Sequence, residues 1–176
     1  IVDRPFTVKR LDLDTMVAED LGHPPGSYMA TSAVAINEAG QVGGLAILTN
    51  GGNCDRVAAR YTDGIGWQIF SGCGQGNGVN DMNEQGDVVM PLNVAPYVRF
   101  EGRGTFLIED LILNDVGHWY VSNFSGCTIN SSGWMAVYGT NQVTGQSGAL
   151  LLTPEDATAA VLPADAPRPA LSCSPN

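Results

Sequence analysis

The 176-residue sequence is poor in positive charge. Lys9 is its single lysine, and 8 lysine and arginine residues face 18 acidic ones, for a formal net charge of -10. Such a chain repels phosphate backbones and anionic lipid surfaces, so we expect no nucleic-acid partner. No apolar run reaches the roughly 18 residues that a membrane-spanning helix needs, which predicts no membrane insertion.

Histidine is equally scarce, with only His23 and His118. Neither stands at a spacing typical of metal ligands or of a catalytic base and its partner. Ser147, in Gly145-Gln146-Ser147-Gly148, resembles a nucleophile elbow only superficially, and we interpret it as a turn residue. The sequence therefore predicts no catalytic residue and no enzymatic activity.

One acidic stretch, from Asp81 to Asp87, resembles a calcium loop. It has oxygen ligands at alternate positions and a glycine in sixth place, but position twelve is Leu92 instead of a bidentate glutamate. The equivalent turns elsewhere in the chain are Asn37-Glu38-Ala39-Gly40 and Asn130-Ser131-Ser132-Gly133, which belong to the same repeated element. We therefore expect a hairpin turn here, and no metal or cofactor in the protein.

What the chain has in abundance is glycine, 22 residues, and a turn that occurs three times. The three turns begin with asparagines 46 and 47 residues apart, a period typical of propellers and arrays. Asparagine and glycine tolerate positive φ, which places them at hairpin tips. The predicted structural turns are Asn37 to Gly40, Asn83 to Gly86 and Asn130 to Gly133.

Short alternating β-segments flank each turn, and only residues 106–114 have apolar spacing suited to one helical turn. The pattern predicts an all-β, three-unit propeller-like β-repeat of antiparallel hairpins. We expect a single domain over residues 1–153, with units at about 6–64, 65–105 and 106–153. The proline-rich residues 154–176 are expected to form an extended arm over the surface.

The four cysteines are even in number and none lies in a metal-binding pair, which favours disulfides. Three pairings are open, and the short separation favours Cys54 with Cys73, leaving Cys127 for Cys173. The alternative is four buried thiols in a reducing compartment. Because the sequence begins at Ile1 without methionine, we expect a removed signal peptide and an extracellular or cell-surface location.

Two regions carry a resemblance to a known family. Phe6-Thr7-Val8, Asp20-Leu21-Gly22 and the run from Ala33 to Val42 resemble the opening unit of the bacterial extracellular HAF-repeat proteins. Leu111-Ile112, Trp119 and the run from Thr128 to Pro154 resemble their last repeat. The resemblance covers roughly residues 6–154 and implies an exported, propeller-like fold without established catalytic activity. The His-Ala-Phe triplet itself is replaced, for example by Val57-Ala58-Ala59.

A three-unit array either closes tightly into a small prism or leaves terminal faces that another copy of the chain can cover. We therefore expect a non-enzymatic structural subunit that self-associates head to tail, through the N-terminal residues 1–13 or the tail after residue 153. The alternative is a monomeric secreted binding module for glycans or a cell-surface partner. Six aromatic residues of the chain could form a surface that stacks on sugars. We favour the other interpretation, in which they fill the core. They are Trp67, Trp119, Trp134, Tyr61, Tyr97 and Tyr120, and the possible glycosylation sites are Asn123 and Asn130.

Overall fold

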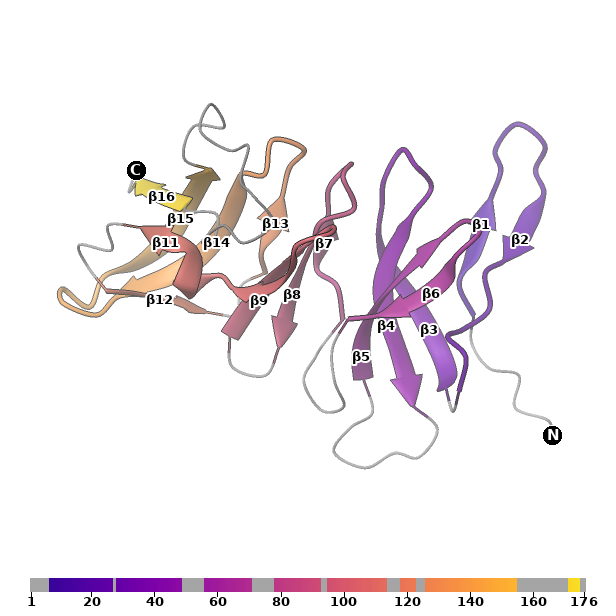
Figure 1. The fold of residues 1–176 in the computed structure, drawn as a ribbon, viewed down its shortest axis with the longest axis horizontal. Helices are drawn as coiled ribbons and strands as arrows, with labels where there is room; N and C mark the ends of the chain where they lie inside the picture. The colour runs from indigo at the N-terminus through magenta and orange to yellow at the C-terminus, as the bar shows by residue number, and fades with distance from the viewer. Residues whose placement is uncertain are drawn as a thin grey trace.

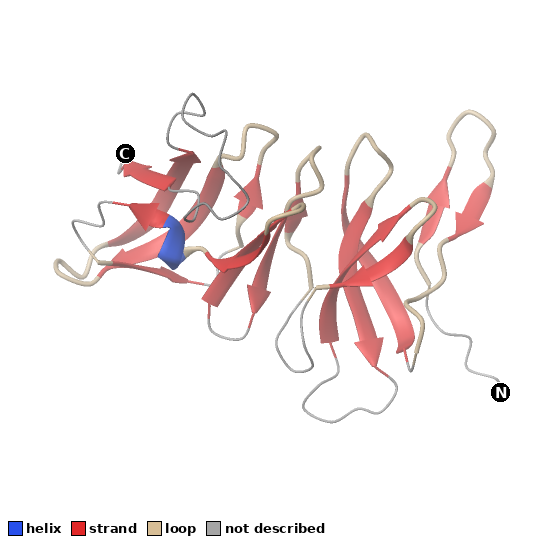
Figure 2. Cartoon of the chain, viewed as in Figure 1, coloured by secondary structure: helices blue, strands red, loops and turns tan. Residues whose placement is uncertain are grey.

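The computed structural model describes eight segments of the chain: residues 7–26, 28–48, 56–70, 78–92, 95–113, 118–122, 126–154 and 171–174. In this part of the chain the strands form four β-sheets that follow one another along the long axis of the molecule (Figure 1). Apart from one short 3-10 helix, η1 (Glu109–Leu111), every regular element is a strand (Figure 2). The all-β prediction is confirmed, and the described strands do not close into a propeller.

Each sheet is built mainly from strands that neighbour each other in the sequence. The N-terminal hairpin pairs β1 (Lys9–Leu11) with β2 (Ala18–Asp20). The first sheet contains β3 (Tyr28–Ile36), β4 (Val42–Leu48), β5 (Arg56–Thr62) and β6 (Gly66–Ile69). The second contains β7 (Asp81–Met82), β8 (Val88–Leu92), β9 (Ala95–Phe100) and β10 (Gly104–Leu107).

The third sheet lies at the other end of the row and is larger. It contains β11 (Ile112–Leu113), β12 (Trp119–Ser122), β13 (Thr128–Ile129), β14 (Met135–Asn141), β15 (Ser147–Pro154) and β16 (Leu171–Ser174). Its strand order is β11-β16-β15-β14-β12, and β13 pairs with β14. Each of the three large sheets therefore contains one hairpin with an asparagine turn: β3–β4, β7–β8 and β13–β14.

The core is divided among the interfaces between successive sheets. Val8 and Leu21 of the N-terminal segment pack with Trp67 of the first sheet. Ala58 of the first sheet shares a second cluster with Met90 of the second sheet. The third cluster joins the second and third sheets through Val89, Val98, Met135, Val137, Leu150 and Leu152. Burying a side chain of this size contributes about 1.5 to 3 kcal/mol, so stacking of neighbouring sheets is what stabilises each of them.

The sheets shift two expected unit boundaries. β6 pairs with β5, so the boundary at residues 64 and 65 falls inside the β5–β6 hairpin. The boundary at residues 105 and 106 likewise falls inside β10, which pairs with β9. The helical turn expected in residues 106–114 is present as η1, directly after β10.

The described part of the C-terminal tail, Leu171–Ser174, is a strand within the third sheet, so the expectation of an extended arm is corrected for these residues. β16 lies between β15, with which it is antiparallel, and β11, with which it is parallel. Leu171 to Ser174 contain no proline, so their backbone can form these ladders. Residues 155–170, with most of the expected proline-rich segment, lie outside the described residues.

Candidate functional site: a ladder of asparagine turns

The three predicted turns share one hydrogen-bonding pattern. In each, the glycine N–H donates to the asparagine carbonyl, at 2.9, 3.0 and 2.9 Å. The glycine φ values are +74°, +81° and +77°, a region that favours glycine. The predicted role in hairpin tips is confirmed for Asn37–Gly40, Asn83–Gly86 and Asn130–Gly133.

The asparagine side chains connect the turns of successive sheets. Asn37 Nδ2 donates to the carbonyl of Asn83 at 3.1 Å, and Asn83 Nδ2 donates to the carbonyl of Asn130 at 3.2 Å. Asn37 and Asn83 are buried, whereas Asn130, at the end of this ladder, is exposed. The spacing of 46 and 47 residues in the sequence is therefore the spacing of a hydrogen-bonded ladder across three sheets.

A second acceptor accompanies the first two rungs of the ladder. Asn37 Nδ2 also donates to Gln41 Oε1 at 2.8 Å, and Asn83 Nδ2 to Asp87 Oδ2 at 3.0 Å. The corresponding position in the third turn is Trp134, whose side chain has no acceptor oxygen. The third turn thus departs from the other two at the end of the array, as terminal repeats commonly do.

The carboxylates of the calcium-like stretch accept hydrogen bonds from backbone N–H groups. Asp81 Oδ2 accepts from Ile129 N at 3.0 Å, and Glu84 Oε2 accepts from Glu38 N at 2.8 Å, so both connect neighbouring sheets. Asp87 Oδ1 accepts from Glu101 N at 2.7 Å. No three histidine, cysteine or acidic residues among the described segments are grouped so that they could hold a metal ion.

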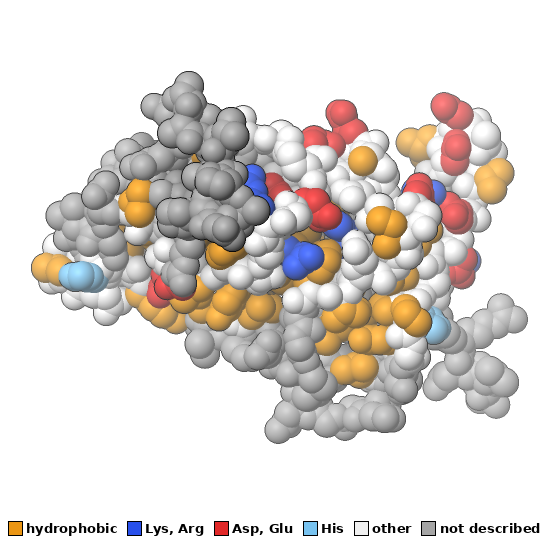
Figure 3. Space-filling model, in the orientation of Figure 1, with side chains coloured by type: hydrophobic (Ala, Val, Ile, Leu, Met, Phe, Trp, Pro, Cys, Tyr) orange, Lys and Arg blue, Asp and Glu red, His pale blue; other side chains and the backbone are white. Residues whose placement is uncertain are grey.

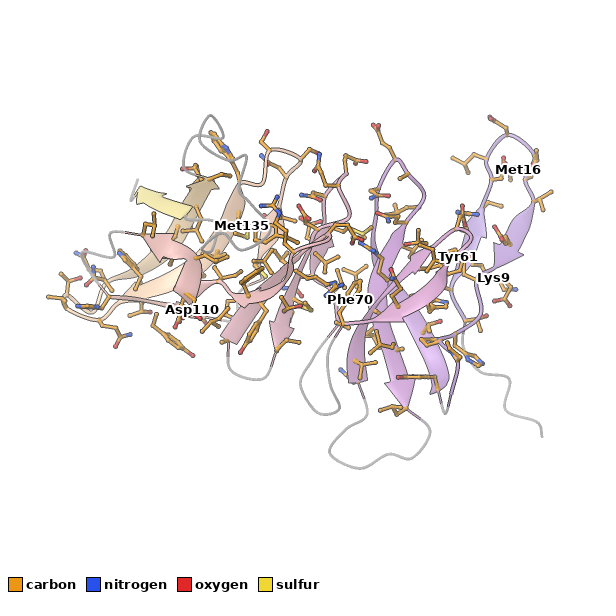
Figure 4. All side chains as sticks on the ribbon, viewed as in Figure 1. Lys9, Met16, Tyr61, Phe70, Asp110 and Met135 are labelled. Carbon is orange, nitrogen blue, oxygen red and sulfur yellow. The ribbon has the colours of Figure 1, made fainter. Side chains whose placement is uncertain are left out.

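Arg60 is a residue that sequence reasoning missed. It is 2% exposed, and its Nη1 donates to the carbonyl of Gly86 at 2.6 Å and contacts Glu101 Oε2 at 2.8 Å. Its Nη2 donates to Gln68 Oε1 at 2.9 Å. The guanidinium also lies 5.2 Å from the ring centre of Phe70, at the junction of the first and second sheets (Figure 4). An arginine directly after the apolar run Val57-Ala58-Ala59 was the available signal.

Arg10 in the N-terminal hairpin makes the same kinds of contact with the first asparagine turn as Arg60 makes with the second. Its Nη1 donates to the carbonyl of Gly40 at 3.4 Å and to Asp63 at 2.8 Å, and its Nη2 contacts Glu19 at 2.7 Å. The hydrogen bonds that Arg10 donates to Asp63 and, second in size, to Glu19 raise the pKa of Arg10. Because its side chain is 27% exposed and both acidic partners are more than half exposed, these pairs contribute little stability.

Three residues remain that we considered for catalysis in the sequence: His23, His118 and Ser147. His23 Nδ1 lies 3.1 Å from the carbonyl of Pro24, and His118 is exposed. Ser147 is the first residue of β15, with its hydroxyl 2.7 Å from that of Thr140, so our interpretation of it as a turn residue is corrected. In this position the serine hydroxyl stabilises a cross-strand pair.

The aromatic residues divide into core and surface. Trp67 is buried, donates from Nε1 to the carbonyl of Leu21 at 2.8 Å and packs edge-on against Tyr61. Trp119 and Tyr97 pack against hydrophobic clusters. The expectation of core filling is confirmed for these four. Tyr120 and Trp134 are instead exposed, at 40% and 45%.

The expected Cys127–Cys173 disulfide is wrong. Cys127 is a buried free thiol directly before β13, and Cys173 lies in β16. The order β13-β14-β15-β16 separates them by three strand spacings, or about 14 Å, twice the Cα separation that a disulfide spans. Cys54, Cys73 and the glycosylation candidate Asn123 lie outside the described residues, so those sites stay predictions, as does glycosylation at Asn130.

The buried Cys127 thiol predicts a loss of stability at alkaline pH. Burial raises its pKa from 9.0 to about 11, with Asp81 acting in the same direction and a hydrogen bond from Asn80 opposing it. The unfolded chain loses this proton first, so the free energy of unfolding should fall by about 2 to 3 kcal/mol as the pH rises from about 9 to 11. Urea titrations of wild type and Cys127→Ala across this range measure the difference. Parallel pH curves for the two proteins would contradict it.

Comparisons with known proteins identify no family for this chain. A scan against protein-family models gives no match, and searches of curated proteins and of solved structures also give none. The resemblance to HAF-repeat proteins therefore stays a prediction. No helix in the described segments is long and apolar enough to cross a membrane.

Proposed function

We propose that this chain is a non-enzymatic extracellular structural subunit, a three-unit propeller-like β-repeat that assembles head to tail with copies of itself. The observation that carries the proposal is the difference between inner and outer sheets. Every residue of β8, in the second sheet, is buried, because a sheet packs on each of its faces. β14, in the third sheet, alternates between buried and exposed residues, so one of its faces is uncovered.

The uncovered face of the third sheet supplies the tail contact. We define the tail face as Tyr120, Ala136 and Tyr138, which the β12–β14 and β13–β14 registers place on one side of the sheet. The two tyrosines are 40% and 38% exposed. Asn130 is exposed at the same end of the row, and within the described segments no further asparagine turn accepts its amide. This end resembles an inner interface from which one partner is missing.

The N-terminal hairpin supplies the head contact at the opposite end of the row (Figure 1). We define the head face as Leu11, Leu13, Met16 and Val17, which are 48%, 77%, 70% and 61% exposed. In Figure 3 hydrophobic and acidic side chains lie side by side on this hairpin. Contiguous apolar residues in an exposed hairpin are typical of an interaction surface. Two different faces at opposite ends propagate into a filament or ring.

The head-to-tail arrangement can be tested by mixing variants with one blocked end. We expect wild type to form high-order oligomers in size-exclusion chromatography with light scattering. Leu11→Asp/Val17→Asp, with a blocked head, and Tyr138→Asp, with a blocked tail, should each be monomeric. Their equimolar mixture should contain dimers and nothing larger, because one intact head then meets one intact tail. Ile65→Asp, which places the same charge at a 66% exposed apolar site between the ends, should assemble like wild type.

Three outcomes would contradict the proposal. They are a monomeric wild type, a blocked variant that still dimerises with itself, and a mixture that stays monomeric. A monomeric wild type that binds glycans through Tyr120, Trp134 and Tyr138 would favour the alternative, a secreted binding module. The exposure of these three rings is the observation behind that alternative.

A further inference from the structure

The N-terminal hairpin reproduces the outer half of a complete sheet. In the first sheet, Arg60 of the third strand pairs with Gln68 of the fourth, and its guanidinium reaches the turn of the next sheet at Gly86. In the hairpin, Arg10 of β1 pairs with Glu19 of β2 and reaches the turn of the first sheet at Gly40. β1 and β2 therefore stand against the first sheet as β5 and β6 stand against the second.

A backbone hydrogen bond supports this correspondence. It lies two residues along the strands from the pair Arg10–Glu19, and equally from the pair Arg60–Gln68. Leu21 N donates to the carbonyl of Val8 at 2.9 Å, just as Phe70 N donates to the carbonyl of Ala58 at 2.9 Å. The same bond recurs in the second sheet, from Ile108 N to the carbonyl of Pro96 at 3.1 Å. In the two complete sheets, the strand that corresponds to β1 also pairs on its other edge, β5 with β4 and β9 with β8. Among the described residues β1 pairs only with β2.

A groove lies beside the unpaired edge of β1, at the place that corresponds to the first two strands of a complete four-stranded sheet. It has a volume of about 270 Å³ and is lined by Val8 to Leu11, Ala33 to Ile36 and Val42. Leu21 N donates to Val8 O, and Asp12 N donates to Val17 O. The backbone N–H and C=O groups of the even-numbered residues 8, 10 and 12 therefore point toward β2. Since backbone groups alternate along a strand, the N–H and C=O groups of Lys9 and Leu11 point the other way, toward the unpaired edge.

Two further features of the groove show an unoccupied interface. Ile36, directly before the first turn, is 62% exposed, whereas Met82 and Ile129 at the same place in the other turns are 6% exposed because a preceding sheet covers them. The carbonyls of Asn83 and Asn130 each accept the amide of the preceding asparagine as well as their own glycine N–H. Among the described residues, the Asn37 carbonyl has only the bond from Gly40.

We infer that this groove is an acceptor for a further β-hairpin with an Asn-x-x-Gly tip, beyond the three hairpins described above. Its second strand pairs antiparallel with β1, its tip asparagine donates to the Asn37 carbonyl, and its strands cover Val34 and Ile36. The chain's own three hairpins cannot supply it, since β4, β8 and β14 already pair on the edge in question with β5, β9 and β15. The occupant is thus a further hairpin with a free edge, and the inference does not depend on end-to-end assembly.

A backbone-cyclised peptide with the sequence of residues 78–92 is a suitable probe, because it contains the second turn with both of its strands. Cyclisation limits the ordering cost that weakens a free hairpin. Titrated into the full chain, it should slow amide hydrogen exchange at Lys9 and Leu11 at least about tenfold, as ladder hydrogen bonds form. The matched peptide with Asn83→Ala should bind about fivefold more weakly, the value of one hydrogen bond of about 1 kcal/mol.

Two protein variants separate the strand edge from the side chain. Lys9→Pro removes the N–H that faces the groove, so it should abolish peptide binding, whereas Lys9→Ala retains the N–H and should bind like wild type. Lys9 lies on the N-terminal hairpin, at the opposite end of the molecule from the third sheet (Figure 4). If wild type shows no protection of Lys9 and Leu11 at about 1 mM peptide, or if the Asn83→Ala peptide binds equally well, the inference is wrong. Either result leaves the mixing test of end-to-end assembly unaffected.

Discussion

Replacing Arg60 by alanine is expected to lower the free energy of unfolding by about 3 kcal/mol. The change leaves the buried carbonyl of Gly86 without its donor, which costs about 1 to 3 kcal/mol. It also removes the guanidinium from Phe70 and Glu101 and leaves a void between the first and second sheets. Because Arg60 connects two sheets, this loss should appear in the global unfolding transition, measured by urea titration.

Arg10→Ala is the matched control for this result. It removes the same kinds of contact, to a turn carbonyl and two acidic side chains, from a position where the side chain is 27% exposed. Exposed ion pairs contribute at most about 1 kcal/mol, so the control should lose less than that. Equal losses for the two variants would show that burial between the sheets does not decide the contribution of Arg60.

Replacing Gly86 by valine is expected to have a still larger effect, a loss of about 4 kcal/mol. The residue has φ +81°, where a β-branched side chain is strained by about 1 to 3 kcal/mol. A Cβ there would also lie 2.6 Å from Gln41 Oε1 and 2.7 Å from Arg60 Nη1, so two inter-sheet side chains must move. Overpacking of this kind adds about 1 to 3 kcal/mol. Thermal and urea denaturation measure the sum.

Gly133→Val separates the two causes. Gly133 has nearly the same φ, +77°, but a Cβ there meets only Pro154 Cγ at 3.4 Å. The backbone strain is then shared by both variants, and the difference between them reports the contact across the first and second sheets. We expect Gly133→Val to lose about 2 kcal/mol, half the loss at Gly86. A Gly86→Val protein as stable as Gly133→Val would show that the turns do not carry the contact between sheets.

Much of the local structure could be predicted from the sequence. Asn37, Gly40 and their counterparts at Asn83 and Asn130 indicated hairpin tips, because few residues other than asparagine and glycine tolerate the backbone conformation required there. The short helical turn after β10 also followed from local apolar spacing. These features depend on interactions within a few residues, and such interactions are readable in the order of the side chains.

The sequence by itself determined the all-β character, the turn residues and the period that relates the three turns. Only the tertiary structure decided which strands share a sheet, so it moved β6 to the first sheet, inserted β16 beside β15 and separated Cys127 from Cys173. It also decided that Arg60 is a buried link and that the hairpin β1–β2 stands as half a sheet. The physical reason is that strand pairing satisfies the same backbone hydrogen bonds with many partners, and burial between sheets selects one of them.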